Sequence, residues 1–175
     1  MQIVVPDDFK HLYVTDKDRP ILKYPDTRLR QTSAEIKITK RTGLLVDDMI
    51  RIMKRSNGIG LAAPQLGMMQ RVIVIAPDNM RPTALINPKV TRIDGKQLGQ
   101  EGCLSIPGLY GDVERPSFVE VEALDRKGRE LVYEFEGMPA RVVLHEIDHL
   151  DGVLFIDKVI PATLHWMNPE GEPAE

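Results

Sequence analysis

Two histidines and a glutamate lie together in the segment His145-Glu146-Ile147-Asp148-His149. In a helix, residues four apart lie one turn above each other, so both imidazoles can reach one ion. Glu146 follows the first histidine directly, where its carboxylate can move protons at the ion without binding it. The segment therefore indicates a divalent-metal site with an acid/base beside it. A chance match on an amphipathic helix is the weaker alternative.

The third protein ligand decides which kind of metal site this is. Gly152 fits an extended peptidase pattern, but Phe155 stands where that pattern needs a third histidine. The later glutamates lie in the polar segment 169–175, which we expect to be flexible. Cys103, the one cysteine of the chain, is the strongest remaining candidate. A thiolate ligand suits iron(II), zinc, nickel or cobalt rather than magnesium or calcium.

Three other interpretations of these residues stay open. Cys103 could be a nucleophile, although that role needs an adjacent base and leaves Glu146 without a task. The chain could be a metallopeptidase, which an ordered downstream Glu or His on the ion would support. The ion could also be structural, in which case four protein ligands are expected. The spare histidines, His11 and His165, are isolated, and we expect them at the surface or in packing.

A glycine-rich segment, Gly58-Ile59-Gly60-Leu61-Ala62-Ala63-Pro64-Gln65, is the third feature with chemical content. It lacks the Lys-Ser/Thr pair of a phosphate loop and follows a predicted helix instead of opening one, so nucleotide binding is not indicated. Gln65 is a neutral donor that could hydrogen-bond to a developing oxyanion. A surface glutamine at the end of a turn is the alternative.

Two predicted helices must position these residues. Apolar residues recur at helical spacing from Leu44 to Met53, with Thr42 as the expected cap and Asn57-Gly58 as the expected end. The helix that carries the histidines should begin near Pro139, which suits a first turn, and stop near Gly152.

Several predicted strands accompany the helices. The β-branched run 71–76 predicts a buried strand, and the alternating segments 117–124 and 129–136 predict a hairpin around a DRKG turn. Residues 1–24 are mixed and polar, and we expect an arm that lies on the domain. Helices and hairpins in this order predict an α+β fold in which the histidine helix packs into the sheets.

Composition bounds the class of protein. The chain has 175 residues, of which 42% are apolar and 28% charged, as expected for a single globular domain over 1–175. Its net charge of -3 gives no reason to expect sequence-specific nucleic-acid binding. No apolar run approaches the roughly 18 residues that a membrane span needs. The start, MQIVVPDDFK, has no basic lead before an apolar stretch, so we expect a cytoplasmic protein.

Three segments together resemble the peptide deformylase family. The segments GIGLAAPQ, EGCLS and HEIDH follow one another in the family's order, and the resemblance runs from about Ile21 to Val159. It implies antiparallel sheets around the H-E-x-x-H helix. It also implies removal of the formyl group from the N-terminal methionine of newly made polypeptides. Such polypeptides would be the partners, and transient contact with the ribosome is expected from the same resemblance.

By motif position, the resemblance assigns the ligand roles to Cys103, His145 and His149, and the acid/base role to Glu146. It implies iron(II) as the physiological ion, with zinc, nickel or cobalt as substitutes. Zinc prefers four ligands, whereas attack on the formyl group requires the ion to bind a fifth. Iron(II) accepts a fifth ligand more readily.

The resemblance also assigns the residues that contact the substrate. Gln65 and the backbone N–H of Leu104 would hold the oxyanion. Ile59, Gly60 and Gly102 would offer backbone groups to the substrate in a strand-like pairing.

The substrate's methionine side chain needs an apolar pocket. Val142 and Met138 precede His145 by three and seven residues, on the same helix face, and with Ile59 they could line this pocket. A simple core role is about as good an interpretation of Met138. Two positions depart from many relatives, which have Gln at Leu144 and Arg at Tyr110. Neither is a ligand, so these departures concern the rim of the substrate site.

Overall fold

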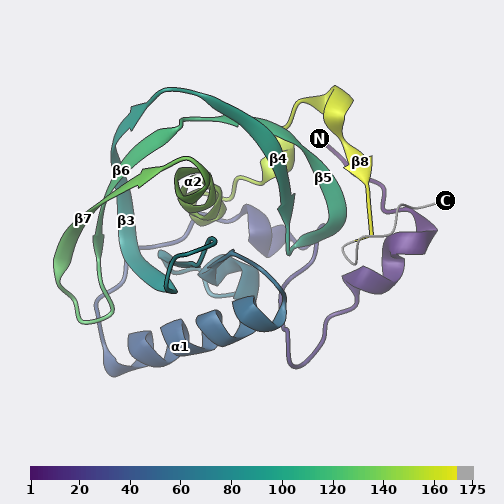
Figure 1. Cartoon of the computed structure of the whole chain (residues 1–175). Helices are drawn as coiled ribbons and strands as arrows, with labels where there is room; N and C mark the ends of the chain where they lie inside the picture. The colour runs from purple at the N-terminus through teal and green to yellow at the C-terminus, as the bar shows by residue number, and fades with distance from the viewer. Residues whose placement is uncertain (169–175) are drawn as a thin grey trace.

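The computed structural model describes residues 1–168, so the expected flexible tail from about 169 lies outside the described residues. The described residues form two antiparallel sheets, two α-helices and five 3-10 helices (Figure 1). This arrangement confirms the predicted α+β class. Within residues 1–168, no helix is long and apolar enough to cross a membrane. The helices and strands are α1 (Lys40–Arg55), α2 (Met138–Leu150), β1 (Gly60–Ala62), β2 (Val72–Ile75), β3 (Thr83–Asp94), β4 (Gln97–Cys103), β5 (Ile106–Arg115), β6 (Phe118–Leu124), β7 (Glu130–Glu136) and β8 (His165–Trp166).

A five-stranded sheet in the order β1-β2-β3-β6-β7 separates the two α-helices. Strand β2 explains this layering, because all four of its residues are buried. Ile73 and Ile75 belong to the apolar cluster around α2, whereas Val72 and Val74 belong to the cluster around α1. Successive side chains of a strand point to opposite faces, so a continuous β-branched run can serve two helices. In Figure 1, α2 is seen end-on within the curve of the strands, and α1 lies below them.

The two predicted helices form, with one correction to their ends. Helix α2 has Pro139 in its first turn and ends just before Gly152, whose φ of 71° lies in the left-handed region. Helix α1 begins earlier than predicted, at Lys40, so Thr42 is not its cap. Thr39 is the N-cap, and the Thr42 side chain accepts a hydrogen bond from the Thr39 amide at 3.0 Å. A polar first turn hid this start, because the apolar spacing begins only one turn later.

A second sheet, in the order β4-β5-β8, closes the site from the other side. Strands β4 and β5 form a hairpin whose register shifts between Gly102 and Cys103. Such an irregularity re-aims a side chain at the end of a strand. It brings Cys103 to the end of β4, opposite α2. The predicted strand at 71–76 and the predicted hairpin at 117–136 are also confirmed, as β2 and as β6 with β7.

The N-terminal segment lies on the second sheet as an arm, as predicted. Its 3-10 helix η1 (Asp7–Tyr13) buries Phe9, which is 5% exposed. The Phe9 ring lies 5.0 Å from the ring of Trp166 in β8. The arm is therefore held against the β5 and β8 side of the molecule, next to the end of β4.

Candidate active site

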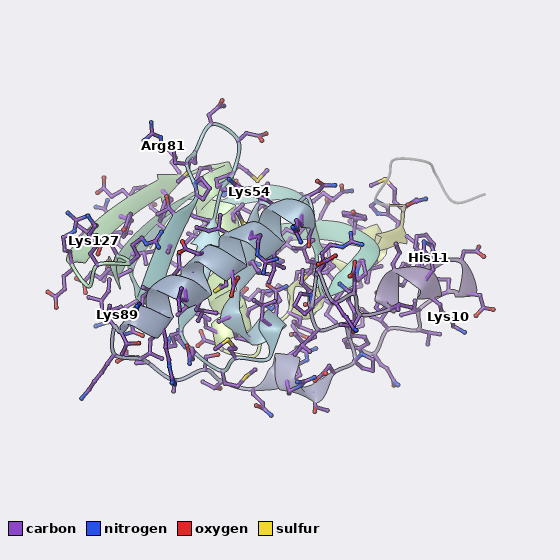
Figure 2. The ribbon with its side chains drawn as sticks, turned by 90° about the horizontal axis from the view of Figure 1, so that it is seen from below. Lys10, His11, Lys54, Arg81, Lys89 and Lys127 are labelled. Carbon is purple, nitrogen blue, oxygen red and sulfur yellow. The ribbon has the colours of Figure 1, made fainter. Side chains whose placement is uncertain are left out.

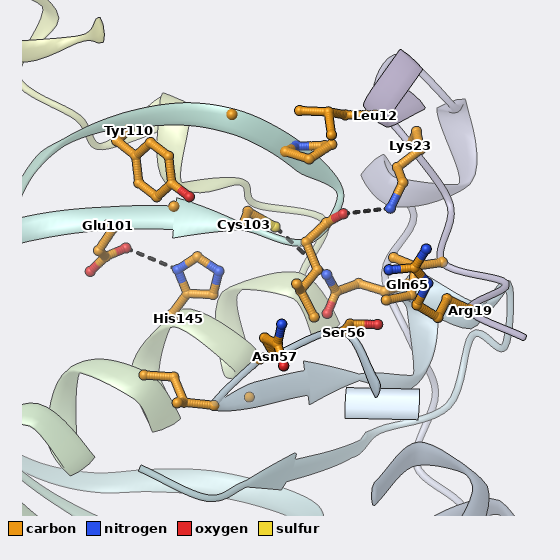
Figure 3. A pocket seen from close by; sticks show the side chains of 18 of the residues that line it. Leu12, Arg19, Lys23, Ser56, Asn57, Gln65, Glu101, Cys103, Tyr110 and His145 are labelled. Carbon is orange, nitrogen blue, oxygen red and sulfur yellow. Dashed lines mark hydrogen bonds and ion pairs between the residues drawn. The ribbon is translucent and has the colours of Figure 1, made fainter. Parts of the chain in front are cut away.

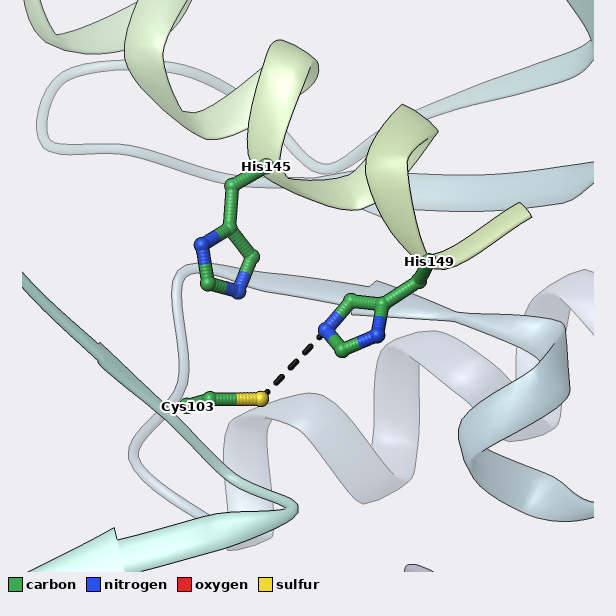
Figure 4. A group of neighbouring side chains, drawn as sticks. All are labelled: Cys103, His145 and His149. Atoms are coloured by element: carbon green, nitrogen blue, oxygen red, sulfur yellow. Dashed lines mark hydrogen bonds between the residues drawn. The ribbon is translucent and has the colours of Figure 1, made fainter. Parts of the chain in front are cut away.

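Cys103, His145 and His149 form a compact group of possible metal ligands (Figure 4). One ligand atom from each lies within 4.8 Å of the others, and Cys103 Sγ lies 3.3 Å from His149 Nε2. In the part of the chain that the structure describes, this group has three members and includes neither His11 nor His165. Three protein ligands leave a coordination position open, as catalytic metal sites require.

The chemistry of these donors fits a divalent transition metal. Burial raises the pKa of Cys103, but the neighbouring His149 and His145 outweigh it and hold this pKa well below its usual value. The sulfur is therefore available as a thiolate, the form that binds metal. One soft thiolate and two imidazoles suit iron(II), zinc, nickel or cobalt. The residues present thus fit the ion that the sequence motif predicts.

Glu101 orients the first histidine. Burial opposes its ionisation, but hydrogen bonds from Arg115 and His145 lower its pKa well below the usual range. Its Oε2 therefore accepts a hydrogen bond from His145 Nδ1 at 2.9 Å. That bond fixes the tautomer of His145 and leaves Nε2 free to bind the ion.

A buried ionic network holds Glu101 in turn. Arg115 donates to both of its oxygens at 2.8 and 2.9 Å, and Arg141 donates to Oε1 at 2.8 Å. Arg115 also donates to Asp148 at 2.6 Å. The side chains of Glu101, Arg115 and Arg141 are each at most 5% exposed. These residues were not predicted from the sequence, although Glu101 and Asp148 stand inside two of the three motifs.

Glu146 lies beside the ligands without belonging to their group. It is 5% exposed, and burial raises its pKa to about 7. Its Oε2 has no hydrogen-bond partner among the described residues. Gly60 leaves room for this carboxylate, because a Cβ there would lie 2.9 Å from the carboxyl carbon. The close approach of the Glu146 carboxylate thus explains a glycine of the GIGLAAPQ segment.

Gln65 points its amide nitrogen at the site. Its Oε1 accepts a hydrogen bond from the Ala62 amide at 2.9 Å, so Nε2 faces Ser105 Oγ at 3.0 Å and Cys103 Sγ at 3.6 Å. At 2% exposed it is not a surface glutamine, and that alternative is wrong. The next residue after the cysteine is also fixed, because Lys23 donates to the Leu104 carbonyl at 2.8 Å. The role of Lys23 had no signal in the motifs.

These residues line one cavity of about 730 Å³ (Figure 3). Two apolar side chains at its mouth are half-exposed, Ile59 at 42% and Met138 at 52%, so Met138 is not a core residue. Val142 is buried at 5%. His149 is 1% exposed and is the one member of the ligand group that does not line the cavity. The other residues that the sequence singled out all line it, namely Ile59, Gly60, Gln65, Gly102, Cys103, Leu104, Met138, Val142, His145 and Glu146.

The two departures from the family pattern lie in different places. Leu144 packs against the apolar cluster around α2, so it does not alter the cavity. Tyr110 lines the cavity, and its ring lies over Gly102, where a Cβ would approach it to 2.6 Å. The ring also stacks on His165 at 6.3 Å between centroids. The rim of the cavity is therefore aromatic at this point.

The sequence and the fold both match known proteins. The family model described as polypeptide deformylase matches residues 18–164. A peptide deformylase of Clostridium acetobutylicum is 49% identical over 142 residues, covering 81% of this chain and 94% of the relative. One from Thermomicrobium roseum is 43% identical, covering 88% and 93%.

Solved structures agree with these sequence matches. The crystal structure of a peptide deformylase from Synechococcus elongatus in complex with actinonin has a TM-score of 0.79 and 41% identity, and covers 83% of each chain. That of the Thermus thermophilus protein has a TM-score of 0.79 and 42% identity, and covers 82% of this chain and 86% of the other. Residues 1–17, which include most of the arm, lie outside the family match.

Proposed function

The chain belongs to the peptide deformylase family, whose members remove the N-formyl group from nascent polypeptides, and we propose that the described cavity carries out this reaction. The observation that supports the proposal is the open three-ligand group of Cys103, His145 and His149 with Glu146 beside it. A divalent ion held by those three residues would polarise the formyl oxygen and lower the pKa of the attacking water.

Glu146 is the acid/base of the proposed reaction. A carboxyl group whose pKa burial raises to about 7 can accept a proton from water and return it near neutral pH. It first takes the proton of the water that attacks the formyl carbon. It then gives this proton to the departing amine, so that formate and a free N-terminus are produced.

Two donors hold the charge that develops on the formyl oxygen. Gln65 Nε2 is fixed toward the ligands by the bond between its own carbonyl and the Ala62 amide. The Leu104 backbone N–H is the second donor, in a turn that Lys23 holds through the Leu104 carbonyl. Donors that are oriented before the reaction stabilise the transition state more than those that must reorganise.

The substrate lies as a strand between β1 and β4. Gly60 of β1, Ile59 directly before it and Gly102 of β4 line the cavity, and their backbone groups pair with the peptide. Ile59, Met138 and Val142 receive the methionine side chain. We propose this pocket because the three apolar side chains line the same cavity, Met138 and Val142 from α2 and Ile59 from the residue before β1.

The function is tested by formate release from formyl-Met-Ala-Ser, with the unformylated peptide as the blank. Glu146→Ala should lose about 10²- to 10⁴-fold in kcat while it keeps one ion per chain. Cys103→Ala should lose both the ion and the activity. Glu136→Ala, on the exposed end of β7, is the matched control and should behave as the unchanged protein. Full turnover by metal-loaded Glu146→Ala would overturn the acid/base assignment, and native metal content in Cys103→Ala would overturn the third ligand.

We further propose iron(II) as the working ion, with nickel or cobalt as substitutes and zinc as the less active occupant. The donor set of one thiolate and two imidazoles suits all four ions. The fifth ligand that the ion must bind during the reaction favours iron(II) over zinc. Iron(II) beside a thiolate is sensitive to oxygen, so aerobic preparation should yield zinc-loaded or partly inactive protein. Exchange to nickel or anaerobic iron(II) should raise formate release at least about tenfold, roughly 1.4 kcal/mol of barrier. Equal rates for fully zinc- and iron-loaded protein would remove the preference and leave the hydrolase intact.

Because nascent polypeptides are the proposed substrates, we propose that the protein is cytoplasmic and contacts the ribosome transiently. Basic side chains are spread over the face that Figure 2 shows, with Lys54 on α1, Lys89 on β3 and Lys127 in the β6–β7 turn. This spread favours weak contact over a dedicated docking patch. Co-sedimentation with ribosomes at low salt tests the contact, and its absence at every salt concentration would contradict it.

A further inference from the structure

The cavity has a second wall that lies outside the family match. We define the arm wall as residues 11–16, the end of η1 and the turn that follows it. Four of its side chains line the same cavity as Cys103 and His145. In Figure 3, Leu12 of η1 lies on the opposite side of the cavity from Glu101 and His145. The four side chains are His11, Leu12, Val14 and Asp16.

The arm wall is held in place from behind. Phe9 packs on Trp166, and Gly108 has no side chain, where a Cβ would lie 2.6 Å from the Phe9 ring. After the wall, the chain is held against the domain again, because Ile21 is 1% exposed and the Leu22 amide donates to the Gln65 carbonyl at 2.7 Å. The arm is therefore anchored at both ends of the wall, which keeps the wall beside the cavity.

Two apolar side chains of the arm wall border the cavity. Val14 is 72% exposed although it borders the cavity, and Leu12 is partly buried there. An exposed valine on the surface alone would need no explanation. Here two apolar residues border a cavity that continues to the proposed reaction centre.

The proposed substrate geometry leaves this part of the cavity for the later residues of the peptide. The methionine side chain fills the α2 end, where Met138 and Val142 lie, and the formyl group is at the ligands. The rest of an extended peptide adds about 3.3 Å per residue and must leave on the side away from α2. The arm wall borders that side, together with Pro107 and Gly108 of β5.

We propose that the arm wall is an outer subsite that binds the residues of the nascent peptide beyond its second position, through apolar contacts with Leu12 and Val14. This inference rests on the proposed function. It makes residues 11–16 a determinant of how this protein distinguishes longer formylated peptides from formylated dipeptides. An extended peptide that lies against a preformed apolar surface gains affinity without new chemistry, so the effect belongs in KM.

The test compares formyl-Met-Ala with formyl-Met-Ala-Ser-Leu-Val-Ala on the metal-loaded protein. Val14→Asp should lower the ratio of kcat/KM for the hexapeptide to that for the dipeptide at least about threefold, through KM of the hexapeptide. Val4→Asp is the matched control, because Val4 is 84% exposed on the same arm and does not line the cavity. It should leave the ratio unchanged. Calorimetry with the deformylated hexapeptide should show the same weakening without any turnover.

A charge scan identifies the contacting residue. In a set of hexapeptides with one Lys at position 3, 4, 5 or 6, Val14→Asp should favour one member about threefold, as an exposed ion pair allows. Val4→Asp should favour none. An unchanged ratio and a flat scan for folded Val14→Asp would overturn the outer subsite, as would equal losses on both substrates. Absence of formate release by the unchanged protein from both peptides would instead refute the proposed function itself.

Discussion

The two walls of the cavity differ in how firmly they are held. On the catalytic wall, formed by β1, β4 and α2, Glu101 makes four hydrogen bonds to largely buried partners. The arm wall is held from outside its own residues by the buried Phe9, and the ion pair of its Asp16 with Arg19 is exposed. Chemistry demands ligands and donors fixed to a fraction of an ångström, whereas a peptide that leaves the site tolerates a looser surface.

The two walls differ in rigidity because the charged pairs of the catalytic wall are buried and those of the arm wall are exposed. Arg115 and Glu101 interact in a region that excludes water, where an unpaired charge is costly. Every residue of that network therefore depends on the others. Arg19 and Asp16 are about half-exposed, and such pairs contribute little to stability. The catalytic wall should respond strongly to single changes, and the arm wall weakly.

Glu101→Ala should give the largest loss of stability. It leaves Arg141 buried without a carboxylate and leaves Arg115 with Asp148 alone, and breaking a buried pair in this way typically costs about 3–5 kcal/mol. It also frees the His145 ring, and loss of such a partner lowers metal affinity about 10- to 100-fold. Chemical denaturation of the metal-free protein and a competition titration with a chelator measure the two effects separately.

Glu114→Ala is the matched control for that change. Glu114 lies on β5 and pairs with Lys96 at 3.0 Å, with both side chains largely exposed. Its removal should cost less than about 1 kcal/mol. Similar losses for the two variants would mean that burial does not distinguish the network from the surface.

Gln65→Ala should come next, with an effect on rate more than on folding. Removal of one oxyanion donor typically costs about 2.7–4 kcal/mol of barrier, or about 10²- to 10³-fold in kcat. The metal content should stay at one ion per chain, because Gln65 Nε2 lies 3.6 Å from Cys103 Sγ and is not a ligand. Steady-state formate release with metal analysis measures both, and exposed Gln31→Ala is the control. A normal kcat would show that Gln65 only supports the Cys103 turn.

The motif on α2 predicted that His145 and His149 come together, because its spacing is tied to local structure. A four-residue spacing on a helix brings His145 and His149 together whatever surrounds them, and the alternation in 117–136 specifies a hairpin directly. The other contacts of the site could not be predicted, because they join residues that are far apart in the sequence. Glu101 and Arg115 meet through the β4–β5 pairing, and Lys23 reaches Leu104 across 81 positions. The start of α1 at Thr39 and Lys40 was missed because its first turn has no apolar face.

The arm was predicted as a segment lying on the domain, but not as a wall of the cavity. Leu12 and Val14 have no spacing that points to a site, since their position depends on Phe9 and on the distant Trp166. A local pattern cannot encode a contact between residue 9 and residue 166. Such contacts become visible only when β8 pairs with β5 and brings the two ends of the chain together.

Phe9→Ala should have only a small effect on global stability, and it tests directly whether the arm wall opens independently of the catalytic wall. A buried Phe→Ala change in a cooperative core costs about 3–5 kcal/mol. If the arm opens as a local unit, the cost is limited to its own docking free energy. We therefore expect a global loss below about 1 kcal/mol, or about 2–4 °C in Tm. Trypsin should cleave faster after Lys10 and Lys17, and the preference for the formylated hexapeptide should fall as in Val14→Asp.

Phe155→Ala is the matched comparison, because Phe155 is 1% exposed in the apolar cluster beneath β5. Cys103 packs against that cluster, so its disruption should reach the ligands and cost the full amount for a core phenylalanine. Denaturation curves and hydrogen exchange across residues 7–16 distinguish local opening from global unfolding. Equal losses for the two phenylalanine variants would make the arm part of the core and both walls equally rigid. A small loss of stability for Phe9→Ala, with fast hydrogen exchange confined to the arm, would show that the variant loses the outer subsite and keeps the catalytic wall intact.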